Sequence, residues 1–154
     1  DINHLINDTC KLIENRLADD GITIYKEHNP VPQIEANYTE ISQVITNILL
    51  NSRDAIKETY NEAQRQGTIR IKTYEQDDTV IIETTDDGCG IAEADLAKVY
   101  DPFFTTKDIG KGTGLGLYVV QQIIGRHGGS VNVSSKVAEG TTITIKLPIT
   151  KHGN

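Results

Sequence analysis

The sequence predicts an α/β fold in which helices cover one face of a mixed, mostly antiparallel sheet. Segments with helical periodicity alternate with strand-like segments, and two pairs of strand-like segments are each joined by a short turn, which implies antiparallel pairs. The 154 residues, 37% of them hydrophobic, suit one core, and no repeat or Pro/Gly/Ser-rich linker divides them. We therefore expect a single domain over residues 1–154.

The first half of the chain is predicted to contain two helices and one strand. Apolar residues recur at helical spacing within residues 1–20 and predict an opening helix that ends at Gly21. Residues 22–26 are typical of a short strand, and His28 falls in the Pro-containing loop expected after it. Residues 37–56 begin with a helix-start box and continue as one apolar stripe, so they predict the longest helix.

The second half is predicted to be richer in strands. Residues 68–74 and 79–85 are rich in β-branched residues and predict a hairpin that turns at residues 75–78. The remaining predicted elements are a short helix over 92–99, an irregular loop over 101–111, a helix over 115–124 and a closing hairpin over 130–135 and 141–147.

Composition excludes several classes of function. The formal net charge of −7 argues against a nucleic-acid surface, because phosphate backbones require clustered Lys and Arg. No apolar run approaches the roughly 20 residues that cross a bilayer, and the start of the chain lacks a signal-peptide profile, so we expect no membrane contact by this domain. Cys10 and Cys89 lack CxxC spacing, which indicates neither a disulfide framework nor a zinc site and fits the cytoplasm.

A polar stripe accompanies the apolar face of the longest predicted helix. Asn47, Asn51 and Asp54 are spaced i, i+4 and i+7, so they project within a narrow arc. Mg²⁺ prefers a few hard oxygen ligands, with water and phosphates completing its shell, which makes the Asn51 amide oxygen a candidate ligand. Taken alone, the stripe is explained more simply by exposure to solvent.

A first glycine-containing loop begins with Asp86 directly after a predicted strand. The strand can hold the carboxylate rigidly, and Gly88 and Gly90 let a ligand ring approach the backbone. A carboxylate accepts a hydrogen bond from the exocyclic amine of adenine but would face the carbonyl oxygen of guanine, so it would select ATP over GTP. This short motif alone is also compatible with an ordinary turn aspartate.

A second glycine-rich loop, residues 110–117, leads into a predicted helix. The amides and dipole of a helix N-terminus favour phosphate, and Gly112, Gly114 and Gly116 would open the backbone to phosphate oxygens. Leu115 and Leu117 supply apolar anchors that a flexible glycine linker would not need. Neither a Walker A motif nor a Rossmann GxGxxG motif is present.

Four segments, taken in order, resemble the N, G1, F and G2 boxes of sensor histidine kinases. They are residues 47–55, 86–90, 101–107 and 112–117. The similarity runs from about Ile34 to Pro148, and the order and spacing of four boxes are far more specific than any one of them. The resemblance implies the Bergerat fold of the GHKL superfamily, a two-layer α/β sandwich, and an ATP-binding catalytic domain.

The resemblance also implies a site. ATP and Mg²⁺ would be its ligands, with Asn51 on the metal, Asp86 on the adenine amine and residues 100–112 as a lid. Lys107 and Lys111 are candidate phosphate contacts, although solvated loop charges explain them equally well. The expected catalytic residues are Asn47 and Asn51, and the expected ATP-binding residues are Asn47, Asn51, Asp54, Asp86, Gly88, Gly90, Ile91, Lys107, Lys111, Gly112, Thr113, Gly114, Leu115, Gly116, Leu117 and Thr142.

Three positions refine what the resemblance implies. Gyrase and the Hsp90 chaperones carry a water-activating glutamate four residues before the magnesium asparagine, where this chain has Asn47, and an amide is no general base near neutral pH. Many family members carry Lys where this chain has Asp54, which would repel phosphate unless magnesium or water lies between. Phe103 and Phe104 are expected to pin the lid to hydrophobic surface.

The phosphoacceptor motif of the family, a box resembling HExxxP, does not occur in this sequence. His4, His28 and His152 lack its context, and His127 is expected to be structural. We therefore expect the acceptor on a separate upstream hairpin for dimerisation and histidine phosphotransfer, a homodimeric parent, a response regulator receiver domain as partner, and no self-phosphorylation by this chain. Three alternatives stay open: a hydrolysing GHKL ATPase, an anti-sigma-type serine kinase and a non-catalytic nucleotide-sensing module.

Overall fold

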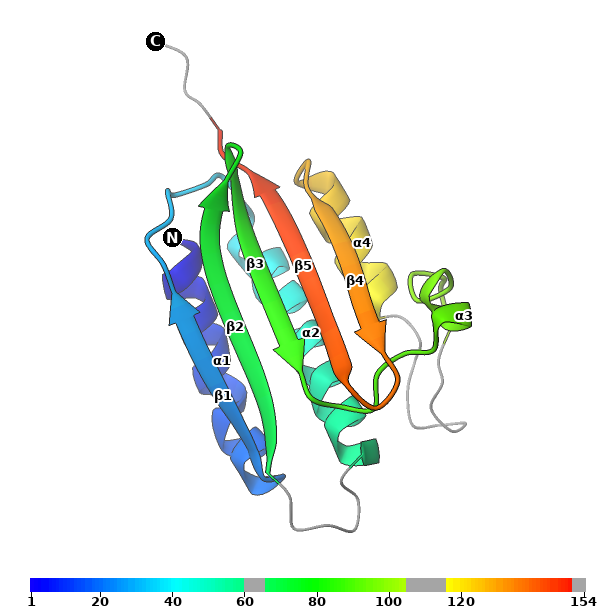
Figure 1. Ribbon diagram of the computed structural model, residues 1–154. Coiled ribbons are helices and arrows are strands. Elements are labelled where there is room, and N and C mark those ends of the chain that lie inside the picture. The colour runs from blue at the N-terminus through cyan, green and yellow to red at the C-terminus, as the bar shows by residue number, and fades with distance from the viewer. Residues whose placement is uncertain (60–65, 105–115, 151–154) are drawn as a thin grey trace.

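The computed structural model describes residues 1–59, 66–104 and 116–150, which form two layers, one of strands and one of helices (Figure 1). The elements in chain order are α1 (Ile2–Asp19), β1 (Ile22–His28), α2 (Tyr38–Thr59), β2 (Gly67–Gln76), β3 (Thr79–Asp86), α3 (Glu93–Leu96), α4 (Gly116–Arg126), β4 (Ser130–Lys136) and β5 (Gly140–Pro148). None of the helices in the described segments is long and apolar enough to cross a membrane.

The described strands form one mixed sheet in the order β1-β2-β3-β5-β4. β1 and β2 are parallel, as their connection through α2 requires, and the other three pairings are antiparallel. The mixed, mostly antiparallel sheet predicted from the sequence is therefore confirmed. This order places the end of β3 beside the start of β5, where Asp86 is paired with Thr141.

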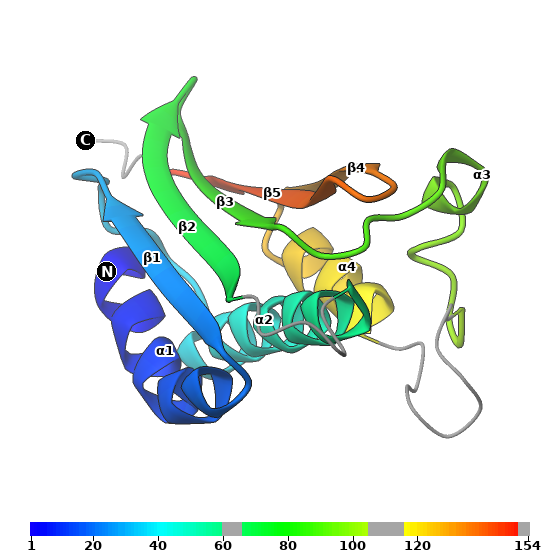
Figure 2. The ribbon, with the colours of Figure 1, turned by 60° about the horizontal axis from the view of Figure 1, so that its bottom comes forward.

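Helices α1, α2 and α4 cover one face of the sheet, as Figure 2 shows. The core lies between the layers because alternate strand residues, such as Ile69 and Ile71 of β2 and Ile143 and Ile145 of β5, are buried against the helices. α2 runs through the middle of the helical layer and packs against both α1 and α4. It is therefore the element on which site residues from different strands and helices can meet.

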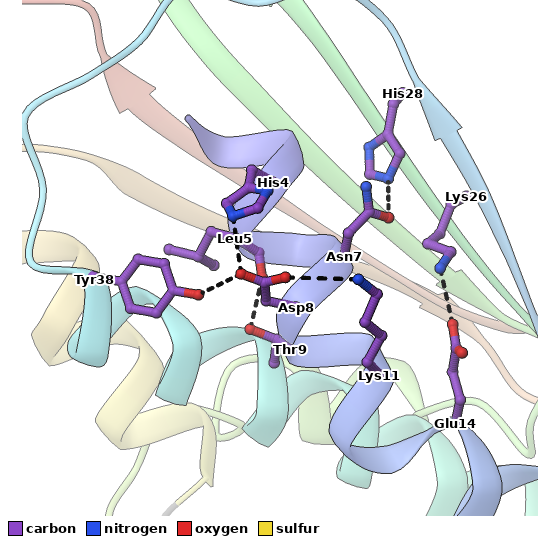
Figure 3. Close-up of polar contacts among 10 residues, drawn as sticks. All are labelled: His4, Leu5, Asn7, Asp8, Thr9, Lys11, Glu14, Lys26, His28 and Tyr38. Atoms are coloured by element: carbon purple, nitrogen blue, oxygen red, sulfur yellow. Dashed lines mark hydrogen bonds and ion pairs between the residues drawn. The ribbon is translucent and has the colours of Figure 1, made fainter.

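Polar contacts fasten α1 to the rest of the fold (Figure 3). Lys26 of β1 donates to Glu14 at 2.8 Å, and the hydroxyl of Tyr38 donates to Asp8 at 3.1 Å. His28 is the last residue of β1 rather than part of a loop, which corrects the sequence prediction. The strand continues this far because His28 is paired with Thr73 of β2 and its ring nitrogens contact amide oxygens of α1.

Two predicted elements are shorter than expected. The turn between β2 and β3 consists of Asp77 and Asp78, at φ values of 51° and 58°, because Asp tolerates the left-handed region that a two-residue hairpin turn requires. The helix predicted over residues 92–99 is only the four residues of α3. No residue of α3 is buried and Ala92 provides no side-chain cap, so little holds a longer helix together.

Candidate functional site

Asp86 is the last residue of β3, and its carboxylate is buried, with 6% of the residue exposed. Its Oδ1 accepts a hydrogen bond from the Gly88 amide at 2.9 Å. The Ser52 hydroxyl and the Thr141 amide also hydrogen-bond this carboxylate. Three separate parts of the chain, namely the loop after β3, the helix α2 and the strand β5, therefore fix the orientation of one acidic side chain.

The surroundings of Asp86 act on its charge in opposite directions. Burial raises the pKa of Asp86, and the negative charge of Asp87 adds to this effect. The hydrogen bonds from Gly88, Ser52 and Thr141 lower the pKa, but burial outweighs them and the pKa stays above its ordinary value. Asp86 is thus an oriented, largely dehydrated acceptor, which suits it to a specific hydrogen bond from a ligand.

Close packing explains the glycines of the loop that follows. A Cβ at Gly88 would lie 2.7 Å from the Cβ of Ala55, and the Cys89 amide donates to the Ala55 carbonyl at 3.2 Å. Gly90 has a φ of 76°, and a Cβ there would lie 2.0 Å from the carbonyl oxygen of Lys136. The loop is therefore wedged between α2 and the β4–β5 turn. Its glycines are required by the fold itself, and their contact with a nucleotide stays a prediction.

Two further predicted site residues lie near this loop. The Ile91 amide donates to the Ser135 hydroxyl at 2.8 Å, so its backbone is held by the end of β4. The hydroxyl of Thr142 is 3.1 Å from that of Thr85, and strand alternation puts this pair on the face of the sheet that lacks the helices. Thr141, one residue earlier, points to the same face as Asp86. The structure does not bring Thr142 to Asp86 and gives that place to Thr141.

The polar stripe of α2 meets the start of α4. A Cβ at Gly116 would lie 3.1 Å from Nδ2 and 3.3 Å from Oδ1 of Asn51, so the side-chain amide of Asn51 fills the space that a larger residue at position 116 would need. Asn47 and Asp54 are half-buried on the same helix, about one turn to either side. The N box and the end of the G2 box are therefore neighbours in space, as the resemblance implies.

Most of the predicted phosphate-binding loop, residues 110–117, lies outside the described residues. Gly116 is the first residue of α4, and Leu117 packs against the core. The expected site residues Lys107, Lys111, Gly112, Thr113, Gly114 and Leu115, together with most of the 100–112 lid, lie outside the described residues.

The described start of the predicted lid corrects one expectation. Phe103 is 73% exposed, with a φ of 65°, and does not pin the segment to hydrophobic surface. Val99 is buried, and the hydroxyl of Tyr100 donates to the carbonyl of Val131 on β4 at 3.3 Å. These two residues hold the segment, since residues 101–103 after them are exposed.

Ser52 and Thr141 are the site residues that sequence reasoning missed. Ser52 occupies a position of the buried stripe of α2 where its neighbours are Ile48, Leu49 and Ile56. A serine in such a stripe is the signal that could have identified it, because a buried hydroxyl requires a polar partner. Thr141 carries no comparable signal, because the sequence does not reveal the strand register to within one residue.

The fold and the site define a class of protein. The chain belongs to the family of histidine kinase-, DNA gyrase B- and HSP90-like ATPases, whose sequence profile matches residues 36–151. Within that family it is an ATP-binding catalytic domain of the sensor histidine kinase class, and its sheet and helices are those of the Bergerat fold. The family and fold expected from the four boxes are thereby confirmed.

Three similar proteins support this assignment. Sensor histidine kinase ZraS of Escherichia coli K12 is 35% identical over 150 residues, which are 97% of this chain and 30% of that protein. Signal transduction histidine-protein kinase AtoS of the same strain is 37% identical over 155 residues, which are 99% of this chain and 24% of that protein. The catalytic domain of histidine kinase ThkA matches with a TM-score of 0.81 and 30% identity, over 97% of this chain and 95% of that one. The chain spans less than a third of the two curated relatives.

Proposed function

We propose that this chain binds Mg·ATP where β3, α2 and the start of α4 meet, and that within a longer protein it donates the γ-phosphoryl group to a histidine. The observation that carries the proposal is the buried Asp86 carboxylate, which hydrogen bonds hold from three sides. The helix α2, which contributes one of these bonds, also places the side chain of Asn51 against Gly116 at the start of α4. The oriented acceptor at Asp86 suits the base of a nucleotide, and the N-terminus of α4 at the other end of the site suits its triphosphate.

In this arrangement Asp86 accepts a hydrogen bond from the adenine amine. Guanine would present a carbonyl oxygen to the same carboxylate, so GTP is disfavoured. The amides at the start of α4 lie at the positive end of that helix and favour phosphate. Lys107 and Lys111 stay candidates for the γ-phosphate contact.

Asn51 is the proposed magnesium ligand. No three His, Cys, Asp or Glu side chains in the described segments group together as a metal site. An amide oxygen supplemented by phosphate and water oxygens suits Mg²⁺, and the contact with Gly116 directs this amide toward the phosphate-binding end of α4. A bound magnesium ion supplies charge neutralisation for the triphosphate.

Asn47 favours phosphoryl transfer over hydrolysis. It lies one turn before Asn51 on α2, where an amide can orient water but cannot accept its proton near neutral pH. A site that binds ATP without activating water retains the γ-phosphoryl group until an acceptor arrives. Asn47 and Asn51 therefore act by position and charge rather than by acid–base chemistry.

The names of the relatives support the proposed context. ZraS and AtoS are histidine kinases, so we infer a parent in which a separate upstream hairpin carries the acceptor histidine and joins two copies as a homodimer. A response regulator receiver domain is the expected recipient of the phosphoryl group. The inferred location of this domain is the cytoplasm, where ATP and receiver domains are available.

Titration calorimetry with Mg·ATP tests the site. Asp86→Asn replaces half of the carboxylate by an amide donor that faces the donor amine of adenine, so we expect affinity to fall about 10- to 100-fold, the range for a hydrogen bond to a charged group. Asp87→Asn is the matched control, because Asp87 uses Oδ1 to accept from the Thr68 amide and an Asn can retain that bond. Equal affinities of wild type and Asp86→Asn would remove the basis of the proposal.

Phosphate release and label transfer separate the alternatives. A hydrolysing ATPase would release phosphate steadily, and the release would persist in Asn47→Ala and vanish in Asn51→Ala. A serine kinase would give an acid-stable product, whereas a histidine kinase supplied with its hairpin gives an acid-labile one. A nucleotide-sensing module would bind ATP and yield neither.

A further inference from the structure

His28 ends β1 beside the first turns of α1, and both of its ring nitrogens face side-chain amides of that helix. Nδ1 lies 2.9 Å from Oδ1 of Asn3, and Nε2 lies 3.2 Å from Oδ1 of Asn7, a contact drawn in Figure 3. A neutral imidazole has one donor and one acceptor nitrogen, whereas an imidazolium has two donors. Two amide oxygens around one ring therefore suit the charged form, and in the neutral form one of the two amides must turn.

Asn3 is the amide whose orientation is fixed. Its Oδ1 accepts from the Thr73 hydroxyl at 2.6 Å, and its Nδ2 donates to the Asn29 carbonyl at 2.9 Å. A half-turn of this amide would set its oxygen against the Asn29 carbonyl oxygen, so Oδ1 stays toward His28. Nδ1 of His28 must therefore carry a hydrogen in both charge states of the ring.

Asn7 is the amide that can turn. Within the described segments, His28 is the only hydrogen-bond partner of the Asn7 side chain. A half-turn of the Asn7 amide breaks no other bond and places its NH₂ group opposite Nε2. The neutral ring then accepts from Asn7, and the charged ring donates to it.

The charges around the ring disfavour the imidazolium. Lys26 precedes His28 by two residues on the same face of β1, and its ammonium donates to Glu14 of α1 at 2.8 Å. The two amides of α1 and the threonine hydroxyl of β2 are neutral, and the carboxylate of Asp8 is directed to Tyr38 instead (Figure 3). Burial, and then the charge of Lys26, lower the pKa of His28, so the ring is neutral near neutral pH.

We propose that His28, Asn3 and Asn7 form a proton-operated latch that fastens the start of α1 to the edge of the sheet and loosens in acid. The neutral ring donates from Nδ1 to Asn3 and accepts at Nε2 from Asn7. A proton taken from water by Nε2 makes the Asn7 amide turn, in surroundings that offer the new charge no carboxylate. The latch belongs to the fold and does not depend on the proposed ATP site.

The lowered pKa sets the direction of the response. Because the folded protein binds this proton less readily than the opened segment does, the latch contributes its full stability above the ordinary histidine pKa of 6.5. That stability is lost as pH falls through the lowered pKa of His28. Apolar residues of α1, such as Leu5 and Ile6, are buried in the core, so we expect the start of the helix to open more often without the helix being lost.

Nitrogen NMR of the histidine rings tests the hydrogen-bond pattern. In the wild-type chain at about pH 8, we expect His28 as the tautomer with its hydrogen on Nδ1 and with Nε2 as a hydrogen-bonded acceptor. The opposite tautomer would contradict the fixed orientation of Asn3 and overturn the latch.

Hydrogen exchange measures the fastening itself. Protection of the amides of residues 5–10, relative to their intrinsic rates, should be about two- to tenfold lower at about pH 5.5 than at about pH 8, the range for one neutral hydrogen bond. In Asn7→Asp a carboxylate would face Nε2 and stabilise the imidazolium, so the pH dependence should reverse. Protection in wild type that does not change with pH, or an unreversed dependence in Asn7→Asp, would overturn the proposal.

Two further variants assign the response to His28. His28→Gln removes the titrating ring, so the difference in protection between the two pH values should disappear. His4→Gln is the matched control, because His4 lies on the same helix but is exposed and pairs with Asp8, and this variant should respond as wild type does. A pH response that persists in His28→Gln, or disappears in His4→Gln, would place the switch elsewhere on α1.

Discussion

At Asp86 the stability of the fold and the proposed recognition of adenine oppose each other. Its burial raises the pKa of the carboxyl group, which means that the folded protein carries a free-energy cost when Asp86 is ionised. The three donors around it reduce this cost without removing it. The amino group of bound ATP would donate a further hydrogen bond to the Asp86 carboxylate. Binding of ATP would therefore offset part of the free-energy cost that the free protein carries.

The raised pKa of Asp86 gives a pH-dependent prediction for unfolding. Below the ordinary carboxyl pKa of 3.8 both states are protonated and the cost is absent, and it is fully present above the raised folded-state pKa. The stability of wild type relative to Asp86→Asn should therefore fall as pH rises above 3.8 through the raised pKa of Asp86. Urea denaturation of both proteins from acid to neutral pH measures the difference. A difference that stays constant with pH would contradict the raised pKa.

Cys89 provides a second prediction at the residue scale. Burial raises the pKa of its thiol to about 11, and the Glu58 carboxylate, which accepts from the Cys89 Sγ at 3.3 Å, adds to the effect. Because the thiolate is the reactive form, iodoacetamide at about pH 7.5 should modify Cys89 at least tenfold more slowly than an ordinary thiol.

Glu58→Gln tests the cause of this low reactivity. Removal of the carboxylate lowers the pKa of Cys89, so modification should become faster, as measured by peptide mass spectrometry. Cys10, which is fully buried and whose thiol pKa is also raised to about 11, lies apart from Glu58 and should keep its rate. An unchanged Cys89 rate in Glu58→Gln would assign the whole effect to burial.

At the scale of elements, the start of α2 is fixed by the end of α4. The Asn37 side chain accepts from the Glu40 amide at 3.0 Å, as the predicted helix-start box requires. In a full capping box the Glu40 side chain would accept from the backbone amide of Asn37. Here that backbone amide donates to Nε2 of His127 at 3.0 Å, and Nδ1 of His127 lies 2.8 Å from the Ile123 carbonyl. The structural role expected for His127 is therefore a cap that joins two helices.

His127→Ala should lower the free energy of unfolding by about 1–2 kcal/mol, because it leaves the backbone amide of Asn37 without its hydrogen-bond partner. Arg126→Ala is the neighbouring control. Its ion pair with Glu40 is 2.7 Å long but exposed, and exposed pairs contribute about 0.2–1 kcal/mol. Denaturant unfolding would count against the cap if both variants lost the same stability.

A second link joins α2 to the turn before β1. Arg53 and Lys57 pair with Asp20, and the hydrogen bond from Arg53 is the largest cause that lowers the pKa of Asp20. A lowered folded-state pKa stabilises the fold above the ordinary value of 3.8, and this stability is lost as pH falls through the lowered pKa. Arg53→Ala should therefore cost about 1 kcal/mol near neutral pH and less in acid, measured by urea denaturation. A cost independent of pH would contradict the pairing.

For the whole molecule, the sequence predicted what depends on local pattern. Asp86 and Asn51 were proposed as site residues because a glycine pattern after a strand and a polar stripe on a helix are visible in one dimension, and the two hairpins followed from pairs of strand-like segments joined by short turns. Thr142 was predicted as a site residue and Thr141 was not, because the face of a strand residue depends on a register that the turn sets in three dimensions. The exposure of Phe103 could not be predicted, because hydrophobic character does not reveal whether a surface is available to bury it.

The final prediction concerns phosphorylation by the chain as a whole. Its described histidines are engaged in contacts on the helix–sheet scaffold: His4 pairs with Asp8 at 3.1 Å, His28 contacts Asn3 and Asn7, and His127 caps α2. The sequence also lacks the acceptor box of the family. The isolated chain should therefore bind ATP labelled in the γ-phosphate without acquiring label.

Label should appear, in an acid-labile form, on the histidine-phosphotransfer hairpin of the proposed parent protein when such a hairpin is supplied as a separate protein. Asp86→Asn, which is expected to bind ATP about 10- to 100-fold more weakly, should slow this transfer at ATP concentrations below saturation, so the label depends on the proposed site and not on a contaminating kinase. The physical reason is that this domain binds and orients the nucleotide, whereas the nucleophile must come from another segment. Label on the isolated chain at a rate rivalling that of the two-component mixture would show that an acceptor lies within these 154 residues.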